Sequence, residues 1–188
     1  MTRRLAIALV HYPVVDGQGA IVTTAVTNLD VHDLARSART YGCSDYFVVH
    51  PIAAQRELVE RIRKHWTEGS SAKRIPDRSE ALRLLRVVSN LDDVWQALGG
   101  RSTIEVWATA ARDLGPSLSF LEARNRLSEG TDSRTVVMLF GTGWGLARGV
   151  TSLADSMLEP IRAATEAYNH LSVRAAGAIA LDRLLGSR

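Results

Sequence analysis

The chain alternates between short apolar runs and longer segments in which apolar and polar residues recur with helical spacing. The apolar runs have the length and the branched side chains of strands that are buried on both faces of a sheet. On this basis we predict strands at residues 5–10, 45–50, 85–89, 103–111, 135–140 and 156–161. The β-branched stretch 20–28 is also expected to be extended.

Helices are predicted where apolar residues share one face and where capping residues mark the ends. In residues 28–42, Asp30 is the expected N-cap and Gly42 ends the helix. Further helices are predicted at residues 51–66, 91–99, 117–127 and 170–186, the last with Asn169 as its N-cap. The polar, turn-rich stretch 68–80 is expected to be a loop.

The order of these elements predicts the fold class. Strands and helices alternate along almost the whole chain, which favours an α/β fold with a mainly parallel sheet and helices on both faces. The length of 188 residues fits a single domain that covers residues 1–188. In sheets of this kind, ligands bind at the carboxyl ends of the strands.

The most unusual local sequence follows one of these strands. Gly141, Gly143 and Gly145 come directly after it, with Trp144 between two of them. One glycine is enough for a turn, so three favour a loop that lets the backbone approach a ligand. The loop lacks the Lys-Ser/Thr pair of a P-loop, and its glycine spacing differs from that of the dinucleotide fingerprint. We therefore expect a single nucleoside-like ligand, with a plain strand-to-helix turn as the alternative.

Two further segments are candidates for the same pocket. Residues 159–161 leave one predicted strand, and residues 106–112 end another with small side chains that leave room for a ligand. A solvated carboxylate is the alternative for Glu159. If the strands are neighbours in the sheet, the loops that follow them lie side by side.

The last predicted helix, residues 170–186, is apolar on nearly all sides. A helix of that kind must be buried over most of its surface. Its run of alanine and glycine at residues 175–178 also allows another backbone to come close. We therefore expect this helix to lie in a dimer interface.

Composition and charge narrow the functional classes only slightly. The formal net charge is +3 and the pI is about 9.4. These values fit an RNA or phosphate partner, but they also fit a protein whose few additional arginines have no binding role. Cys43 is the single cysteine, which excludes an internal disulfide and a cysteine-built zinc site and favours the cytoplasm. We expect no metal. Residues 5–10 are too short for the apolar part of a signal peptide, and no stretch of the sequence is suited to span a bilayer.

Three segments together resemble the SPOUT superfamily of RNA methyltransferases. They are TNLDVHDLARSARTYG early in the chain, LFGTGWGL late, and LEPI followed by YNHLSVRAAGAIALDRLL at the end. The resemblance covers nearly the full chain and points to a small single-domain bacterial subgroup. It implies an α/β knot, in which the C-terminal segment threads through an earlier loop, although knots are rare among folds. It also implies S-adenosylmethionine (SAM) as the cofactor, a tRNA or rRNA substrate, and a homodimer formed through the last helix.

The resemblance implies three walls that hold the cofactor, largely through backbone groups. The first wall is the glycine loop with the strand end before it, namely Leu139, Phe140, Gly141, Thr142, Gly143, Trp144, Gly145 and Leu146. The second is Glu159, Pro160 and Ile161, and the third is Asn169, His170, Leu171, Ser172 and Val173, with Thr109 at another strand end. The loop is one residue shorter than in relatives and lacks their glutamate.

The resemblance also implies catalytic candidates. In related ribose methyltransferases, an asparagine precedes the catalytic arginine in an Asn-x5-Arg motif, and here Asp30 and Arg36 occupy those places. His32 and Asp33 are further candidates for a base, and Arg39 is a rival of Arg36. The alternatives are a helix cap for Asp30 and a solvated residue for Arg36. Because the motif differs from that of its relatives, both a base and a ribose stay open as the acceptor.

RNA contact requires basic surface, for which the candidates are Arg56, Arg61, Arg63, Lys64, Lys73, Arg74 and Arg78. Nearby glutamates dilute this charge, so that a solvated helix face is the alternative. The function we expect is SAM-dependent methyl transfer to a base or ribose of tRNA or rRNA. The alternative function is a non-catalytic nucleotide- or RNA-binding module on the same fold, which the missing asparagine and glutamate would suit.

Overall fold

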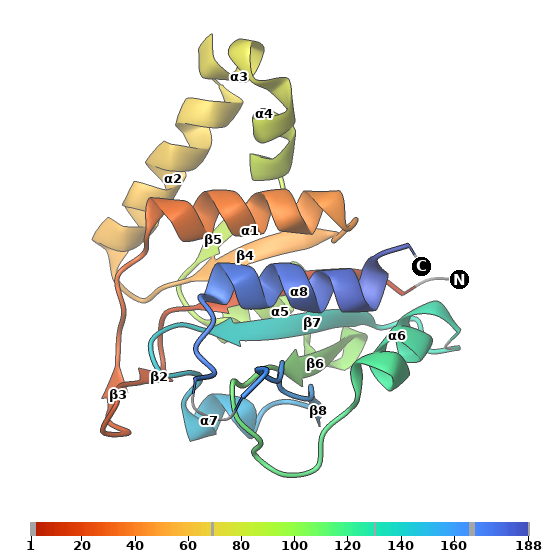
Figure 1. Cartoon of the computed structure of the whole chain (residues 1–188). Coiled ribbons are helices and arrows are strands. Elements are labelled where there is room, and N and C mark those ends of the chain that lie inside the picture. Colours follow the sequence, from red (N-terminus) through yellow and green to blue (C-terminus); the bar gives the residue numbers. More distant parts are fainter. Residues whose placement is uncertain (1–2, 69, 130, 166–167, 188) are drawn as a thin grey trace.

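The computed structural model describes residues 3–68, 70–129, 131–165 and 168–187. Its centre is a six-stranded sheet with the order β5-β4-β1-β7-β6-β8 (Figure 1). All neighbouring strands of this sheet pair in parallel. The strands are β1 (Leu5–Val10), β4 (Asp45–Val49), β5 (Leu85–Val88), β6 (Ile104–Ala108), β7 (Thr135–Gly141) and β8 (Ser156–Met157). The predicted parallel α/β sheet is thereby confirmed.

The position of β1 between two other strands explains why its sequence is apolar at every residue. It pairs with β4 on one side and with β7 on the other. Leu5, Ile7 and Leu9 face one hydrophobic core. Ala6 and Val10 face the other core, on the opposite side of the sheet. Because both faces are covered, every position is buried and the period-two pattern of polar residues disappears.

Helices cover both faces of the sheet, as predicted (Figure 1). One core holds side chains of α1 (Asn28–Thr40), α6 (Phe120–Ser128) and α8 (Val173–Leu185). The other core holds side chains of α5 (Leu91–Ala97) and the short α7 (Arg148–Thr151). A short 3-10 turn, η1 (Arg101–Thr103), leads into β6. Within the described parts of the chain, no helix is long and apolar enough to cross a membrane.

Helices α1 and α8 pack closely because α8 carries a glycine at their contact. A Cβ atom at Gly177 would lie 2.5 Å from Cδ2 of Leu34. Leu34 is fully buried, and α8 also packs against α6 and β7. The last helix therefore returns across the sheet to the first helix, and residues from both ends of the chain share one core.

Both predicted N-caps are wrong. The N-cap of α1 is Thr27, whose hydroxyl accepts a hydrogen bond from the backbone N–H of Asp30. Asp30 therefore lies inside the first turn. The N-cap of α8 is Ser172, whose hydroxyl accepts from Ala175. Asn169 lies before the helix, because its amide is used to join two loops, as described below.

Three predicted segments also differ from the structure. Residues 68–80 were expected to form a loop, but they contain α3 (Ser70–Arg74) and most of α4 (Pro76–Leu82). Burial of Ala81 and Leu82 at the end of α4 outweighs the polar composition. The strand expected at residues 156–161 ends at Met157, where pairing with β6 stops. Of the extended stretch 20–28, only β3 (Ile21–Val22) is a strand, paired with β2 (Val14–Val15) in a small hairpin.

Candidate cofactor site

Three loops at the carboxyl ends of the strands are joined by the segment before α8. The Asn169 side-chain amide donates to the backbone oxygen of Ala111, after β6, at 3.0 Å. The same Nδ2 donates to the backbone oxygen of Ile161, after β8, at 3.1 Å. The ring of His170 lies 6.0 Å from the ring of Trp144 in the glycine loop, measured between centroids. The structure thus brings the three implied cofactor walls together.

The three glycines of the loop after β7 are needed for two steric reasons. Gly143 and Gly145 have φ angles of +60° and +112°, which residues with a Cβ rarely adopt. Gly141 has an ordinary φ, but a Cβ there would lie 2.5 Å from the backbone nitrogen of Leu146. The loop folds back tightly, with the N–H of Gly145 donating to the oxygen of Thr142 at 3.0 Å. The loop shape therefore depends on all three glycines.

Trp144 forms an exposed aromatic surface beside this loop. Its side chain is 65% exposed. One edge of the ring packs on the hairpin turn, where a Cβ at Gly17 would lie 3.2 Å from Cε2. The ring of His170 is also a neighbour of Trp144. The ring of Tyr168, which is 72% exposed, lies 6.3 Å from that of His170 between centroids. These rings flank the region where the three walls meet.

A pocket of about 300 Å³ opens between the third wall and α8. It is lined by Ile161, Arg162, Ala163, Tyr168, Asn169, His170, Leu171, Ile179 and Arg183. The backbone N–H groups of Gly143, Ile161 and Leu171, one in each wall, have no hydrogen-bond partner within the described chain. Ile161 and Leu171 line this pocket, whereas Gly143 lies in the glycine loop outside its lining. Free amide donors can bind the ring nitrogens of an adenine, so the donor set suits SAM.

Two of the implied cofactor residues use their side chains to hold the walls themselves. A carboxylate oxygen of Glu159 accepts from the backbone N–H of Phe120, at the start of α6, at 2.6 Å. The hydroxyl and the backbone N–H of Thr109 both donate to the backbone oxygen of Leu139, at 2.8 and 3.1 Å. Both side chains thus join neighbouring elements.

A partly buried hydrogen-bond network behind the glycine loop was not anticipated from the sequence. The Thr142 hydroxyl donates to the backbone oxygen of Val10, so it must accept from the Thr24 hydroxyl, and Thr24 must accept from Nδ1 of His11. His11 is therefore the neutral tautomer with its proton on Nδ1. Its Nε2 is buried without a partner among the described residues. A histidine directly after a buried strand was the available sequence signal.

His50, directly after β4, completes this network. Its Nδ1 accepts from the backbone N–H of Ile52 at 3.1 Å, so that Nε2 donates to the backbone oxygen of Thr24 at 3.0 Å. The two imidazole rings lie 5.3 Å apart between centroids. Burial, followed by the nearby His50, lowers the pKa of His11 to about 4. Both rings are therefore neutral at pH 7, and they hold Thr24 from two sides.

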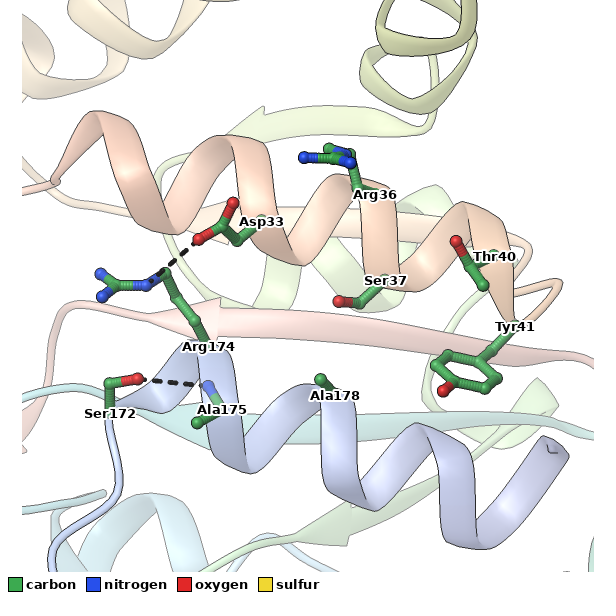
Figure 2. Close-up of a pocket in the computed structure, with 9 residues that line it drawn as sticks. All are labelled: Asp33, Arg36, Ser37, Thr40, Tyr41, Ser172, Arg174, Ala175 and Ala178. Carbon is green, nitrogen blue, oxygen red and sulfur yellow. Dashed lines mark hydrogen bonds and ion pairs between the residues drawn. The ribbon is translucent and has the colours of Figure 1, made fainter.

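The four catalytic candidates lie on α1, but not together. Asp33 and Arg36 line an open groove of about 540 Å³ between α1 and α8 (Figure 2). Arg174 of α8 binds Asp30 at 3.1 Å and Asp33 at 3.4 Å. Figure 2 shows the guanidinium of Arg36 directed away from α8. His32 stands apart from the groove, with its ring 5.5 Å from that of Trp66 of α2 (Ala53–Thr67) between centroids.

Few side chains of the described residues suit nucleophilic catalysis or metal binding. Burial raises the pKa of the Cys43 thiol to about 12, which leaves it protonated and unreactive at pH 7. Among the residues that the structure describes, no three His, Cys, Asp or Glu side chains group together as metal ligands. The site instead offers backbone donors, exposed aromatic rings and an arginine at its border.

The sequence and the fold were both compared with known proteins. Residues 4–186 match a family described as SAM-dependent RNA methyltransferases. The tRNA (guanine-N(1)-)-methyltransferase of Oleidesulfovibrio alaskensis is 44% identical over 188 residues, which are 98% of this chain but 42% of that protein. The chain thus spans less than half the length of this relative and of a second curated tRNA (guanine-N(1)-)-methyltransferase that it matches, each covered to 42%. The activity in their names belongs to the longer proteins.

Solved structures show the same fold. A probable methyltransferase of Bordetella pertussis superposes with a TM-score of 0.63 at 19% identity, covering 97% of this chain and 94% of that one. The SpoU methyltransferase AviRb of Streptomyces viridochromogenes, in complex with AdoMet (SAM), has a TM-score of 0.58 at 15% identity. That match covers 98% of this chain and 58% of AviRb.

Proposed function

The chain belongs to the family of SAM-dependent RNA methyltransferases, and from this we propose that it transfers a methyl group from SAM to RNA at the joined strand ends. The observation that carries the proposal is the position of Asn169 and His170, which link the loops after β6, β7 and β8. AviRb, which shares the fold, was solved with AdoMet. The free amide donors of the three walls support SAM as the cofactor here.

The cofactor would be held mainly by backbone groups of the glycine loop, of Ile161 and of Leu171. Bound SAM supplies an electrophilic methyl group on a sulfonium sulfur. The contribution of the protein is to align the acceptor atom with that methyl group and to keep other geometries out. Trp144 and His170 flank the region where the walls meet and are placed to exclude water from it.

We propose that Arg36 and Asp33 contact the acceptor RNA. Both are exposed on α1, with the Arg36 guanidinium directed away from α8, so a large substrate can reach them. A guanidinium suits a phosphate oxygen because it offers donors in a fixed fork. Asp30 is bound by Arg174 and Thr27, and His32 is packed on Trp66. These contacts favour a supporting role for Asp30 and His32.

The substrate we propose is tRNA, since the two longer relatives are named tRNA methyltransferases. Their guanine-N1 specificity is not carried over, because this chain matches only 42% of each of them. Residues 1–188 would form one domain that carries the cofactor site, and the knot implied by the superfamily would be formed by the segment that leads into α8. A tRNA substrate also favours a cytoplasmic location.

A homodimer through α8 is the second part of the proposal. In the single chain, Val173, Ala176, Ile179 and Leu185 are only half-buried, which leaves apolar surface on α8 uncovered. The groove along α1 and α8 is lined by short side chains, including Ser37, Thr40, Ala175 and Ala178, so that another helix can approach closely. A second copy that covers α8 would also lie beside Asp33 and Arg36, at the border of the site.

Methyl transfer from tritium-labelled SAM to purified RNA tests this function. Incorporation into bulk tRNA lacking modifications, with none into DNA, is the expected result. Binding of SAM and tRNA without incorporation into any RNA would instead favour the non-catalytic binding module. Incorporation into rRNA alone would keep the activity and overturn the choice of tRNA.

A further inference from the structure

Helices α2, α3 and α4 form a projection that we call the arm, residues 53–83. Figure 1 shows it rising beside α1 on the side away from α8. Of the 15 residues of α2 only Val59 is buried, and α3 buries none. The base of the arm is anchored where the end of α4 buries Ala81 and Leu82. Most of the arm surface therefore faces solvent.

The arm carries an excess of positive charge. Residues 53–83 contain eight Arg and Lys against five Asp and Glu, an excess equal to the +3 of the whole chain. Several of these cations are exposed and form no ion pair with any described residue: Arg61, Lys64, Lys73, Arg74 and Arg83. Charges that are exposed and unpaired do little for the stability of the arm and are available to a partner.

Other polar side chains of the arm hold its helices together. The Arg78 guanidinium lies over the Trp66 ring, 4.3 Å from its centroid, and so joins α4 to α2. Arg63 pairs with Glu60 along α2, and Glu80 of α4 pairs with Arg39 of α1. The arm is thus braced by one set of residues and presents a different set to solvent.

The base of the arm contacts the segment before α1 and the residue after β4. The side-chain oxygen of Gln55 accepts from the backbone N–H of Val26, in the segment between Thr24 and α1, at 2.8 Å. Arg56 donates to the backbone oxygen of His50 at 2.9 Å. On the α4 side, Arg78 lies over the Trp66 ring, which in turn lies 5.5 Å from the ring of His32 on α1. Arg78 thus places positive charge where the arm meets α1.

We propose that the arm binds the phosphate backbone of the RNA substrate and so places the acceptor nucleotide at the groove beside Arg36. The proposal rests on the proposed function for the nature of the partner. Guanidinium and ammonium groups that neutralise phosphates release counterions, which gives affinity without sequence preference. The arm would thus supply affinity and orientation, while the groove and the cofactor walls select the nucleotide.

The test is binding of bulk bacterial tRNA as a function of KCl concentration. The variant replaces Arg61, Lys64, Lys73 and Arg74 with alanine, since all four are exposed and unpaired among the described residues. The slope of log K against log salt should become shallower by about 3, because each lost phosphate contact on RNA removes about 0.7 to 0.9. The affinity at moderate salt should fall by at least about tenfold, with the melting temperature and the SAM affinity unchanged.

A second variant of the same arm is the matched control. Glu57→Gln with Glu68→Gln removes negative charge from α2 and its end, so tRNA binding should tighten, while the slope should change little because no cation is gained or lost. Equal affinity and slope for the wild type and the alanine variant would overturn the proposal. Failure of the wild type to bind tRNA at any salt concentration would also overturn it.

The two proposals fail in different ways. Arm-dependent tRNA binding without SAM binding would leave the arm proposal standing and defeat the proposed function. Methyl transfer that persists in the alanine variant, with unchanged tRNA affinity, would leave the proposed function standing and defeat the arm proposal.

Discussion

The hydroxyl groups of Thr24 and Thr142 share a hydrogen bond, although the two residues are 118 positions apart in the chain. Thr24 belongs to the segment that leads into α1, and Thr142 belongs to the glycine loop. Buried behind this bond, His11 donates to Thr24 from the end of β1. The conformation of the cofactor loop is therefore linked to the segment that positions the acceptor-side residues of α1.

Thr24→Val should destabilise the protein by about 1 to 3 kcal/mol, because it leaves the Nδ1–H of buried His11 without an acceptor. Thr24→Ser keeps the hydroxyl and should retain most of the stability. Urea unfolding of the two variants and the wild type measures the difference. Equal stability of the valine and serine variants would show that the network contributes nothing.

Stability should fall as the pH is lowered from 7 to 4. The unfolded chain protonates His11 near pH 6.5, whereas the folded protein does so only near pH 4, so the unfolded state binds more protons in this window. The loss from His11 alone should reach about 3 kcal/mol, since each pH unit between the two pKa values corresponds to about 1.4 kcal/mol.

His11→Asn is the control for this pH effect, because asparagine keeps a donor for Thr24 but does not titrate. Its free energy of unfolding should vary less between pH 7 and pH 4 than that of the wild type. Some dependence should remain, because burial also lowers the pKa of His50 and of His32. An identical pH profile for variant and wild type would contradict the assignment.

Gly141→Ala should weaken SAM binding by at least about tenfold, or about 1.4 kcal/mol. The new Cβ would meet the backbone nitrogen of Leu146 at 2.5 Å, so that the loop has to shift. Gly19→Ala is the matched control, since Gly19 has φ +83° in the hairpin turn but open space around its Cβ. Calorimetric titration of both variants separates backbone strain alone from a change in the cofactor loop.

Arg36→Ala should lower methyl transfer at saturating SAM by at least about tenfold, an effect of about 1.4 kcal/mol on the barrier, and leave SAM affinity unchanged. Arg39→Ala, one turn further along α1 and paired with Glu80, is the comparison. Initial rates with tRNA give the result. Full activity of Arg36→Ala would remove this arginine from the mechanism.

Ala178→Arg should convert the expected dimer into a monomer, because a long charged side chain would enter the groove between α1 and α8. Leu121→Arg, at an exposed position of α6, should leave the dimer intact. Sedimentation velocity at micromolar protein distinguishes the two states. A wild-type protein that is monomeric under these conditions would contradict the proposed interface.

Periodicity was sufficient to find the sheet, because β1, β4 and β7 are buried on both faces and leave continuous apolar runs. It was insufficient for the helix starts. Thr27 and Asp30 can both cap a helix, and the pairing of Asp30 with Arg174, which is 144 residues away in the chain, is not visible in the sequence. Helix α2 of the arm was predicted, but α3 and α4 were not, and α3 has no buried face to give it an apolar period.

The candidate site was likewise predictable from the sequence in one part and not in another. The glycine loop was recognisable because three glycines around Trp144 exceed the needs of a turn. The hydrogen bonds of the Glu159 and Asn169 side chains were not recognisable, because they join loops that meet only in the folded sheet. The resemblance to a family supplied the cofactor, while the structure showed which side chains hold the walls together.

Calorimetric titration of the wild-type chain with SAM tests the central claim most directly. The account predicts saturable binding at one SAM per chain, strongly weakened by Gly141→Ala and unaffected by removal of the arm cations. Absence of any binding heat up to about 1 mM SAM, where even a weak site of about −4 kcal/mol would be half filled, would contradict it.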